Sequence, residues 1–283
     1  MHFTKMHGLG NDFIIINGFQ EQLLERIELL ANRICDRHFG VGGDGLVLLL
    51  PSNGCDLRMR MFNPDGSEAE MCGNAIRCVA QYVFEKKIVE KKIITVETLA
   101  GTITPELVNV GKQVQAVRVD MGEPKLNGPE IPVQGIMGPI IGKTLIVEEK
   151  SYLITCVSMG NPHCILFVND LDPNMPGEVG PKIEKHLFFP QRTNVEFIQI
   201  VNEQEIIMRV WERGAGETLA CGTGACAAVV AGVLNGKIQR EVKVRLAGGE
   251  LMVNWNPVNN HVYLTGPAAT VFEGDLLFSA YLI

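Results

Sequence analysis

Residues 59–75 read MRMFNPDGSEAEMCGNA, and residues 208–224 read MRVWERGAGETLACGTG. Aligned without a gap, the two stretches share Met, Arg, Glu, Cys and Gly, and they place Cys72 opposite Cys221. Each runs from an alternating pattern typical of a strand into a Cys-Gly pair. We infer that they are two copies of one structural unit.

An apolar segment follows each Cys-Gly pair. Residues 75–84 are apolar except for Arg77 and Gln81, and residues 224–234 contain no charged residue. A helix that is apolar on all sides is a buried helix, so the sequence predicts two buried helices that each begin at a cysteine. The unpaired N–H groups and the positive dipole end of a helix N-terminus attract anions. The two cysteines are therefore predicted to flank one anion-binding site.

Further matches extend this repeat over most of the chain. Gly10-Asn11 recurs as Gly160-Asn161, 150 residues later, and Leu99-Ala100-Gly101 recurs as Leu246-Ala247-Gly248, 147 residues later. Matches in one order and at nearly one spacing predict a duplicated domain.

Each half is predicted to consist of short strands around one helix, which places the chain in the α+β class. Strands of the first half are predicted over residues 12–17, 46–50, 57–63, 93–98 and 114–120. Strands of the second half are predicted over residues 145–147, 152–157, 164–168, 195–201, 206–211, 242–246, 250–255 and 261–265. Hydrophobic spacing predicts another helix over residues 20–37, and residues 172–180 are predicted to form a Pro-rich loop before a short helix over residues 180–186.

Glycine- and proline-rich segments separate these elements. Residues 122–139 predict a linker between the halves. The glycine-rich residues 40–45 are not followed by a helix, so they predict a tight loop beside the site rather than a dinucleotide-binding loop. A last strand over residues 271–281 has no counterpart in the repeat and is predicted to return to the first domain.

The composition argues against several classes of function. With 283 residues, 46% hydrophobic and 20% charged, the chain is typical of a two-domain globular protein. A net charge of −7 and the lack of a basic cluster argue against a nucleic-acid partner. No segment resembles a signal peptide or a membrane span, so we expect a cytoplasmic protein with no membrane partner. The eight cysteines form no Cys-x-x-Cys pair, so we expect free thiols and no metal site.

Two thiols at one anion site suit the inversion of a carbon next to a carboxylate. A free thiol has a pKa of about 8.5, and a helix N-terminus lowers that pKa, so the sequence predicts that one thiolate forms readily. Like charge opposes a second thiolate, so the pair is expected to share one proton. One cysteine would act as base and the other as acid. The helix ends would stabilise the charge that develops on the carboxylate, so no cofactor is expected.

Several segments, in order along nearly the whole chain, resemble the diaminopimelate epimerase family. They are residues 8–13, 37–45, 62–67 with 71–74, 160–163, 192–197, and 211–214 with 220–224. The resemblance implies a cofactor-independent isomerase that interconverts LL- and meso-2,6-diaminopimelate, a precursor of lysine and peptidoglycan. It also implies two pseudo-symmetric domains, each a strand-rich half-barrel wrapped around a central buried helix.

The resemblance also implies the domain limits and the assembly. The expected epimerase domains are residues 1–120, completed by a C-terminal strand over residues 269–283, and residues 121–268. A cytoplasmic homodimer is expected, although some members carry a dimer-interface tyrosine where Phe272 stands here. Some members also have a glutamine that contacts the substrate where Gly45 stands here.

Residue roles carry over by position. Cys72 and Cys221 would be the catalytic thiols, and His163 and Glu212 would tune their pKa. The residues expected to bind substrate are Asn11, Asn63, Gly73, Asn74, Asn161, Asn194, Glu212, Arg213, Gly222 and Thr223. An arginine beside a glutamate suits a zwitterionic amino-acid end, because a guanidinium can bind a carboxylate with two hydrogen bonds.

Two other functions fit parts of the pattern. A proline or hydroxyproline racemase also uses two cysteines before glycine, but it has His where Asn74 stands here, and its substrate has no second amino-acid end for Glu212 and Arg213. A non-catalytic amino-acid-binding protein could instead use Cys72 and Cys221 as a thiol switch. Exchange of the substrate α-hydrogen would distinguish an epimerase from such a switch.

Overall fold

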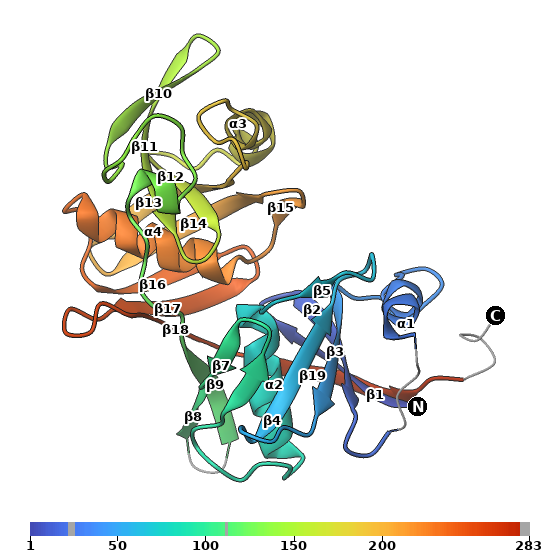
Figure 1. Cartoon of the computed structure of the whole chain (residues 1–283). Helices are drawn as coiled ribbons and strands as arrows, with labels where there is room; N and C mark the ends of the chain where they lie inside the picture. The colour runs from blue at the N-terminus through green and yellow to red at the C-terminus, as the bar shows by residue number, and fades with distance from the viewer. Residues whose placement is uncertain (22–25, 111–112, 278–283) are drawn as a thin grey trace. The chain divides into compact units, whose positions relative to one another are not determined.

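The chain folds as two compact units. The structure is a computed structural model that describes residues 1–21, 26–110 and 113–277 (Figure 1). The first unit consists of Met1–Val119 and Gly266–Ile283, and the second unit consists of Asp120–Thr265.

The first unit is built on a mixed sheet with the strand order β19-β1-β2-β3-β4-β6-β7, in which β5 also pairs with β4. These strands are β1 (His2–Gly8), β2 (Asn11–Asn17), β3 (Gly45–Leu50), β4 (Leu57–Phe62), β5 (Glu68–Ala69), β6 (Val96–Thr98), β7 (Gly101–Ile103) and β19 (Ala269–Asp275). β8 (Glu106–Val110) and β9 (Gln113–Asp120) form an antiparallel hairpin. The helices are α1 (Ile27–Ile34) and α2 (Gly73–Glu85).

The second unit is built on strands in the order β10-β11-β12-β13-β14-β16-β17-β18, in which β15 also pairs with β14. They are β10 (Lys143–Val147), β11 (Lys150–Ser158), β12 (Pro162–Val168), β13 (Asn194–Asn202), β14 (Glu205–Glu212), β15 (Gly216–Thr218), β16 (Glu241–Leu246), β17 (Gly249–Trp255) and β18 (Val262–Gly266). The helices are the short 3-10 helix η1 (Gly128–Glu130), α3 (Met175–Glu184) and α4 (Gly222–Leu234).

The two units share one topology. In the first, β2 and β3 are parallel, β3 and β4 antiparallel, β4 and β6 parallel, and β6 and β7 antiparallel. The same pairings join β12, β13, β14, β16 and β17 in that order. Helices also fall at matching places: α1 and α3 follow the first of these strands, while α2 and α4 lead from the third to the fourth. The predicted α+β fold with a duplicated, strand-rich half is therefore confirmed.

The central helix of each unit is buried, as predicted. α2 and α4 begin directly after Cys72 and Cys221, whose backbones are extended, with φ of −139° and −123°. Every α2 residue from Asn74 to Val83 is buried, Arg77 and Gln81 included. α2 packs against β1, β2, β8 and β19, and α4 packs against β11, β12, β13 and β17. Strands of the same unit therefore surround each helix on more than one side.

Two helices differ from the sequence prediction. α3 begins at Met175, inside the predicted loop, with Pro176 in its first turn and Pro181 in its interior. Pro is tolerated in the first turn because the N–H groups there have no helical partner. Packing against β13 and β14 stabilises the remainder of α3. The contact is close, because a Cβ added to Gly180 would lie 2.5 Å from Trp211. The helix predicted over residues 20–37 is confined to α1, and residues 22–25 of that prediction lie outside the described residues.

The sheet of the first unit ends in a strand from the C-terminal part of the chain. β19 pairs antiparallel with β1, from the His2–Asp275 pair to the His7–Ala269 pair. The sequence-based prediction contains no strand over residues 2–8, and residues 278–283 of the predicted C-terminal strand lie outside the described residues. Along the described parts of the chain, no helix has the length and hydropathy required to cross a membrane.

Candidate active site

The first cysteine centre lies at the start of α2. Cys72 is half-buried, and its Sγ lies 3.9 Å from the side-chain oxygen of Asn11 as a hydrogen-bond donor. Asn74 Nδ2 donates to the same Asn11 oxygen at 3.0 Å. Asn11 opens β2, so the packing of strand and helix brings it to two predicted site residues, Cys72 and Asn74, that are 61 and 63 residues away in the sequence.

The glycine-rich loop holds Asn11 in place. Asp44, at the end of that loop, accepts hydrogen bonds from Asn11 Nδ2 at 2.7 Å and from the Asp12 backbone N–H at 3.0 Å. Because the Asn11 amide donates to Asp44, its oxygen is turned toward Cys72 and Asn74. The predicted glycine-rich loop thus contacts Asn11, and Asp44 was absent from the predicted site residues.

An ion-pair cluster lies behind Asn11. Asp12 pairs with Lys5 at 2.7 Å and with Arg37 at 2.7 Å, and Arg37 also pairs with Asp44 at 2.8 Å. Lys5 is only 6% exposed and also donates to the Gly42 carbonyl. Burial alone would raise the pKa of Asp12, but the hydrogen bonds from Arg37 and Lys5 outweigh it and hold that pKa well below its usual range.

We expect Asp12→Asn to lower the free energy of unfolding by about 3 kcal/mol near pH 7, because it leaves the buried Lys5 ammonium without its carboxylate. The pKa of Asp12 is lowered on folding, so its contribution is complete above the unfolded value of 3.8 and declines as the pH falls below it. Urea unfolding at about pH 7 and pH 3 should therefore show the difference from wild type shrinking in acid.

The matched control for this prediction is Asp275→Asn, because the side chain of Asp275 is 76% exposed and pairs only with His2 among the described residues. It should change stability by less than about 1 kcal/mol. Equal losses from both substitutions would contradict the role given to Asp12.

The second cysteine centre repeats the first at the start of α4. Cys221 is 5% exposed; its Sγ accepts from the Gly224 N–H at 3.4 Å and lies 3.5 Å from Thr223 Oγ1. Asn161 Nδ2 donates to Thr223 Oγ1 at 3.2 Å. A hydrogen bond between Asn74 and Asn11 occupies the same place in the first unit. In both units, an asparagine at the start of a strand or directly before it contacts the second residue of the helix.

Beside Asn161 lies a buried histidine–glutamate pair. His163 Nε2 contacts Asn161 Oδ1 at 3.0 Å, and His163 Nδ1 contacts Glu196 Oε1 at 2.7 Å. Both His163 and Glu196 are 0% exposed. Glu196 was not among the predicted site residues. A glutamate among apolar residues in the buried part of a strand was the feature that could have revealed it.

Burial raises the pKa of the Cys221 thiol well above its ordinary value, and the charge of Glu212 raises it further. The hydrogen bonds from Thr223 and Gly224 act in the opposite direction but do not compensate. The predicted lowering by the helix N-terminus is therefore wrong for Cys221, because the thiolate loses more by dehydration than it gains from the helix end.

Glu212, Arg213 and Asn194 meet at the end of β14. Asn194 Oδ1 accepts from the Arg213 backbone N–H at 2.9 Å, while Asn194 Nδ2 donates to the Pro162 carbonyl at 2.8 Å. Glu212 accepts a hydrogen bond from Thr218 Oγ1. The exposed Arg213 guanidinium donates to the Gln191 carbonyl at 3.2 Å, a neutral partner that leaves its charge available for a carboxylate.

Asn63 is the predicted site residue least connected to the others. It follows β4, and its Nδ2 donates to Ser67 Oγ at 3.0 Å within its own turn. Gly73 and Gly222 are the first residues of α2 and α4, directly after the two cysteines. Across the described ranges, no three His, Cys, Asp or Glu side chains gather in a way that could hold a metal ion.

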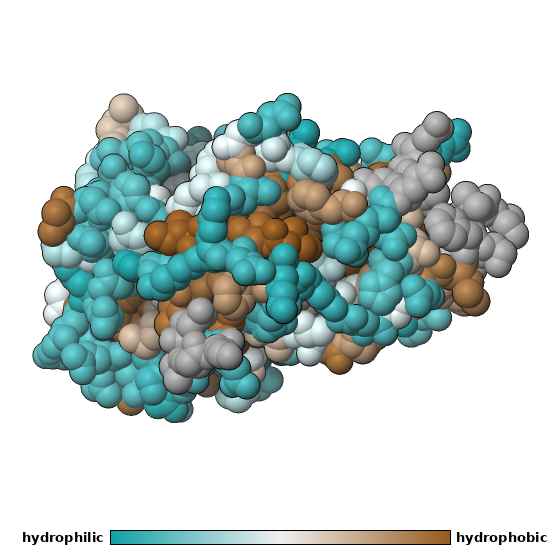
Figure 2. All heavy atoms as spheres, turned by 90° about the horizontal axis from the view of Figure 1, so that it is seen from below, coloured by the Kyte–Doolittle hydropathy of each residue, from teal (hydrophilic) through white to brown (hydrophobic). Residues whose placement is uncertain are grey.

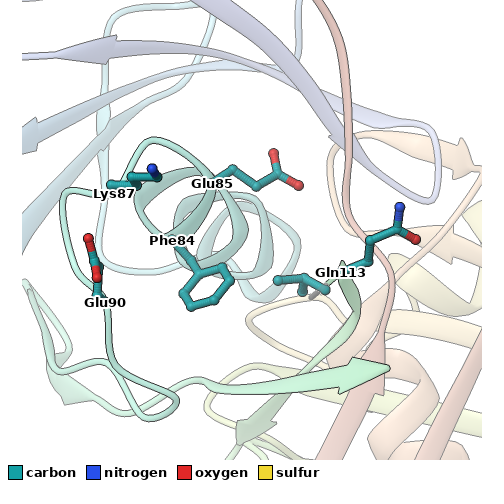
Figure 3. Close-up of a pocket in the computed structure, with 6 residues that line it drawn as sticks. Phe84, Glu85, Lys87, Glu90 and Gln113 are labelled. Atoms are coloured by element: carbon teal, nitrogen blue, oxygen red, sulfur yellow. The ribbon is translucent and has the colours of Figure 1, made fainter. Parts of the chain in front are cut away.

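A hollow of about 690 Å³ lies in the first unit, but not at the cysteine. It is lined by Phe84, Glu85, Lys87, Glu90, Gln113 and Val114, and Figure 3 shows Phe84 at the end of α2 beside it. α2 begins after Cys72 and ends at Glu85, so this hollow is separated from the thiol by the length of the helix, about 20 Å. Hydrophobic patches between hydrophilic side chains are also visible in Figure 2, as on most protein surfaces.

Solved structures define the class to which this fold belongs. The chain aligns with a probable proline racemase from Agrobacterium radiobacter, solved with bound carbonate, over 98% of this chain and 92% of that one. The TM-score is 0.69 and the identity 17%, which establishes the fold alone. The protein therefore has the duplicated fold of the proline racemase type, with a cysteine at the start of each central helix.

Sequence comparison then identifies the family. The family model for diaminopimelate epimerase matches residues 3–127 and 155–271. Proteins named diaminopimelate epimerase from Pelotomaculum thermopropionicum and Moorella thermoacetica are 60% and 56% identical to this chain, over 97% of it and over 98% and 99% of their own lengths. The chain belongs to the diaminopimelate epimerase family.

Proposed function

We propose that this protein is a cofactor-independent epimerase that interconverts LL- and meso-2,6-diaminopimelate. The observation that carries the proposal is the duplicated cysteine, Cys72 and Cys221, at the start of a buried helix in each unit. Membership of the family and near-complete coverage of relatives named for this activity support it. The enzyme is an isomerase.

We infer that each half contributes one catalytic thiol. The two epimerase domains are then residues 1–120, completed by the C-terminal strand, and residues 121–268. In one direction, the Cys72 thiolate takes the α-proton, and the electrons of the C–H bond move toward the substrate carboxylate. Cys221 gives its thiol proton to the opposite face of the same carbon. In the other direction the two roles are exchanged.

The electrostatics of the second unit support this order of roles. Burial and the charge of the neighbouring Glu212 raise the pKa of Cys221, which favours its thiol form as the proton donor. The backbone N–H groups of Gly73, Asn74, Gly222 and Thr223 would hold the reacting carboxylate, where helix ends stabilise negative charge. In this proposal, His163 and Glu212 tune the thiols.

The remaining site residues would recognise the two amino-acid ends of the substrate. Arg213 is proposed to bind the distant carboxylate and Glu212 an ammonium group, since each offers the opposite charge. Asn11, Asn63, Asn161 and Asn194 would supply further hydrogen bonds. The amides of Asn11, Asn161 and Asn194 are already oriented by protein partners, so little side-chain freedom is lost on binding.

Hydrogen exchange tests the function directly. The protein is incubated in deuterated water, without added cofactor, with LL-diaminopimelate, meso-diaminopimelate, proline or alanine. We expect deuterium at the α-carbon of both diaminopimelates and of neither other amino acid, as measured by mass spectrometry. Deuteration of proline alone would favour a proline racemase, and a Cys72–Cys221 disulfide without exchange would favour a thiol switch.

We also propose that the protein is a cytoplasmic homodimer. All eight cysteines are free thiols, which suits a reducing compartment. β19 is an edge strand of its sheet, and Val271 and Phe272 on it are 56% and 46% exposed. An exposed apolar edge strand is a surface that pairs readily with another chain. Light scattering after gel filtration should give twice the mass of one chain, and Phe272→Glu should lower it.

A further inference from the structure

A continuous series of polar side chains runs from Glu196 to the thiol of Cys221. Glu196 contacts His163 at 2.7 Å, His163 contacts Asn161 at 3.0 Å, Asn161 contacts Thr223 at 3.2 Å, and Thr223 contacts Cys221 at 3.5 Å. We call these five residues the polar relay. Its members come from β12 and the residue before it, from β13 and from the start of α4, so only the fold connects them.

The amide of Asn161 fixes which atom donates and which accepts in each hydrogen bond of the polar relay. Its Nδ2 donates to Thr223 Oγ1, so its Oδ1 must accept from His163, and the hydrogen of the imidazole ring lies on Nε2. Thr223 accepts from Asn161 with its oxygen, which leaves its own hydroxyl hydrogen for the sulfur of Cys221. A hydroxyl donor at this place stabilises the Cys221 thiolate that forms when Cys221 has given up its proton.

Glu196, at the other end of the polar relay, determines whether this arrangement of hydrogen atoms is stable. With a hydrogen on Nε2, a neutral His163 ring has an acceptor at Nδ1, so Glu196 must supply a proton to it. Glu196 is 0% exposed, and its Oε2 accepts no hydrogen bond from any residue in the described ranges. Burial raises the pKa of Glu196; His163 opposes that shift, and Glu212 adds to it. The raised pKa favours a protonated Glu196 carboxyl group, which can donate to Nδ1 of His163 at the observed 2.7 Å.

The matching positions of the first unit hold no equivalent of this pair. In the parallel pair β2–β3, Phe13 lies opposite Gly45, and in the matching pair β12–β13, His163 lies opposite Asn194. Phe13 therefore occupies the position of His163. Val47, two residues after Gly45, occupies the position of Glu196. The start of the helix also differs between the units: Gly224 occupies the position that Ala75 has in the first unit. A Cβ at Gly224 would lie 2.7 Å from Glu196 Oε1, so the glycine makes room for the carboxyl group.

We propose that Glu196 is a positioning residue for the second thiol: it holds His163 as the neutral Nε2–H tautomer and, through Asn161 and Thr223, aims a hydroxyl hydrogen at Cys221. This inference rests on the proposed function, because its consequence is the proton transfer at Cys221. It predicts that a donor at position 196 is required and that a negative charge there is not.

Two substitutions separate these requirements. Glu196→Gln keeps a donor for His163 Nδ1 and should retain kcat within about threefold, whereas Glu196→Leu removes it and should lower kcat about 10- to 100-fold with little change in KM. The control is Thr155→Val, which removes another buried hydroxyl of this unit that bonds Gly142 and Asn235, outside the polar relay. Near-normal kcat in Glu196→Leu, or an equal loss in Glu196→Gln, would overturn the inference.

A spectroscopic measurement on the wild-type protein does not depend on how the variants fold. Nitrogen-15 NMR of histidine-labelled protein, with the His163 signals identified by their loss in His163→Gln, reports the tautomer of the ring. The neutral Nε2–H form at about pH 7 is expected. An imidazolium or an Nδ1–H ring would overturn this inference while leaving the epimerase function intact. Absence of α-hydrogen exchange in the wild type would instead overturn the proposed function, and with it the role of Glu196.

Discussion

Cys72→Ala and Cys221→Ala should each reduce the rate of diaminopimelate epimerisation by about 100- to 10,000-fold or more, because each removes a proton donor or acceptor that a methyl group cannot replace. Inversion needs a base on one face of the α-carbon and an acid on the other, so neither thiol should compensate for the other. The rate is measured as the approach to the equilibrium mixture of LL and meso isomers from either pure isomer.

The fold should survive both substitutions. Cys221 Sγ accepts the Gly224 N–H at the start of α4, and loss of such a cap costs about 1 kcal/mol. Circular dichroism and urea unfolding would verify this. Cys226→Ala is the control, because Cys226 is a fully buried cysteine one turn further along the same helix. If Cys226→Ala lost as much activity as Cys221→Ala, the assignment of Cys221 would be wrong.

Arg213→Ala should lower kcat/KM on diaminopimelate by about 30- to 5,000-fold. Removing one member of a hydrogen-bonded charge pair at a binding site costs about 2 to 5 kcal/mol, and each 1.36 kcal/mol corresponds to a factor of ten. Asn194 fixes the backbone of Arg213 by accepting its N–H, and the exposed guanidinium donates to the Gln191 carbonyl. It can therefore receive the distant carboxylate, and that binding also positions the reacting carbon.

The shape of the guanidinium should matter as well as its charge. Arg213→Lys is expected to recover little activity, because an ammonium group cannot form two parallel hydrogen bonds to one carboxylate. Arg245→Ala serves as the control, since Arg245 is a partly exposed arginine of the same unit whose recorded partner is Glu205. A near-normal kcat/KM for Arg213→Ala would place recognition of the distant carboxylate elsewhere.

Local patterns in the sequence were sufficient for much of the fold. The repeat around Cys72 and Cys221 predicted two matching strand-to-helix units, and the apolar segments after them predicted buried helices, because each pattern depends on neighbouring residues alone. The same reasoning failed for α3, where prolines suggested a loop. There the packing of Gly180 on Trp211 outweighs the weak helix propensity of the segment.

Some residues of the candidate site could be selected from the sequence, and others are revealed only by the fold. Cys72 with Cys221, and Asn11 with Asn161, could be selected from the sequence because they recur at matching places in the two halves. Glu196 could not, because it meets His163, 33 residues away, only through the parallel pairing of β12 and β13, and the matching positions of the first half hold Phe13 and Val47. Asp44 likewise acts on Asn11 across 33 residues of sequence.

The protonation of Cys221 shows most clearly what the tertiary structure adds. A cysteine at a helix start predicts a lowered pKa, because the helix end is a local feature that the sequence reveals. The folded protein reverses that prediction: strands and helix bury the thiol, and Glu212 brings negative charge to it from another strand. Burial and charge at one atom depend on residues from the whole unit, and no stretch of sequence contains that information.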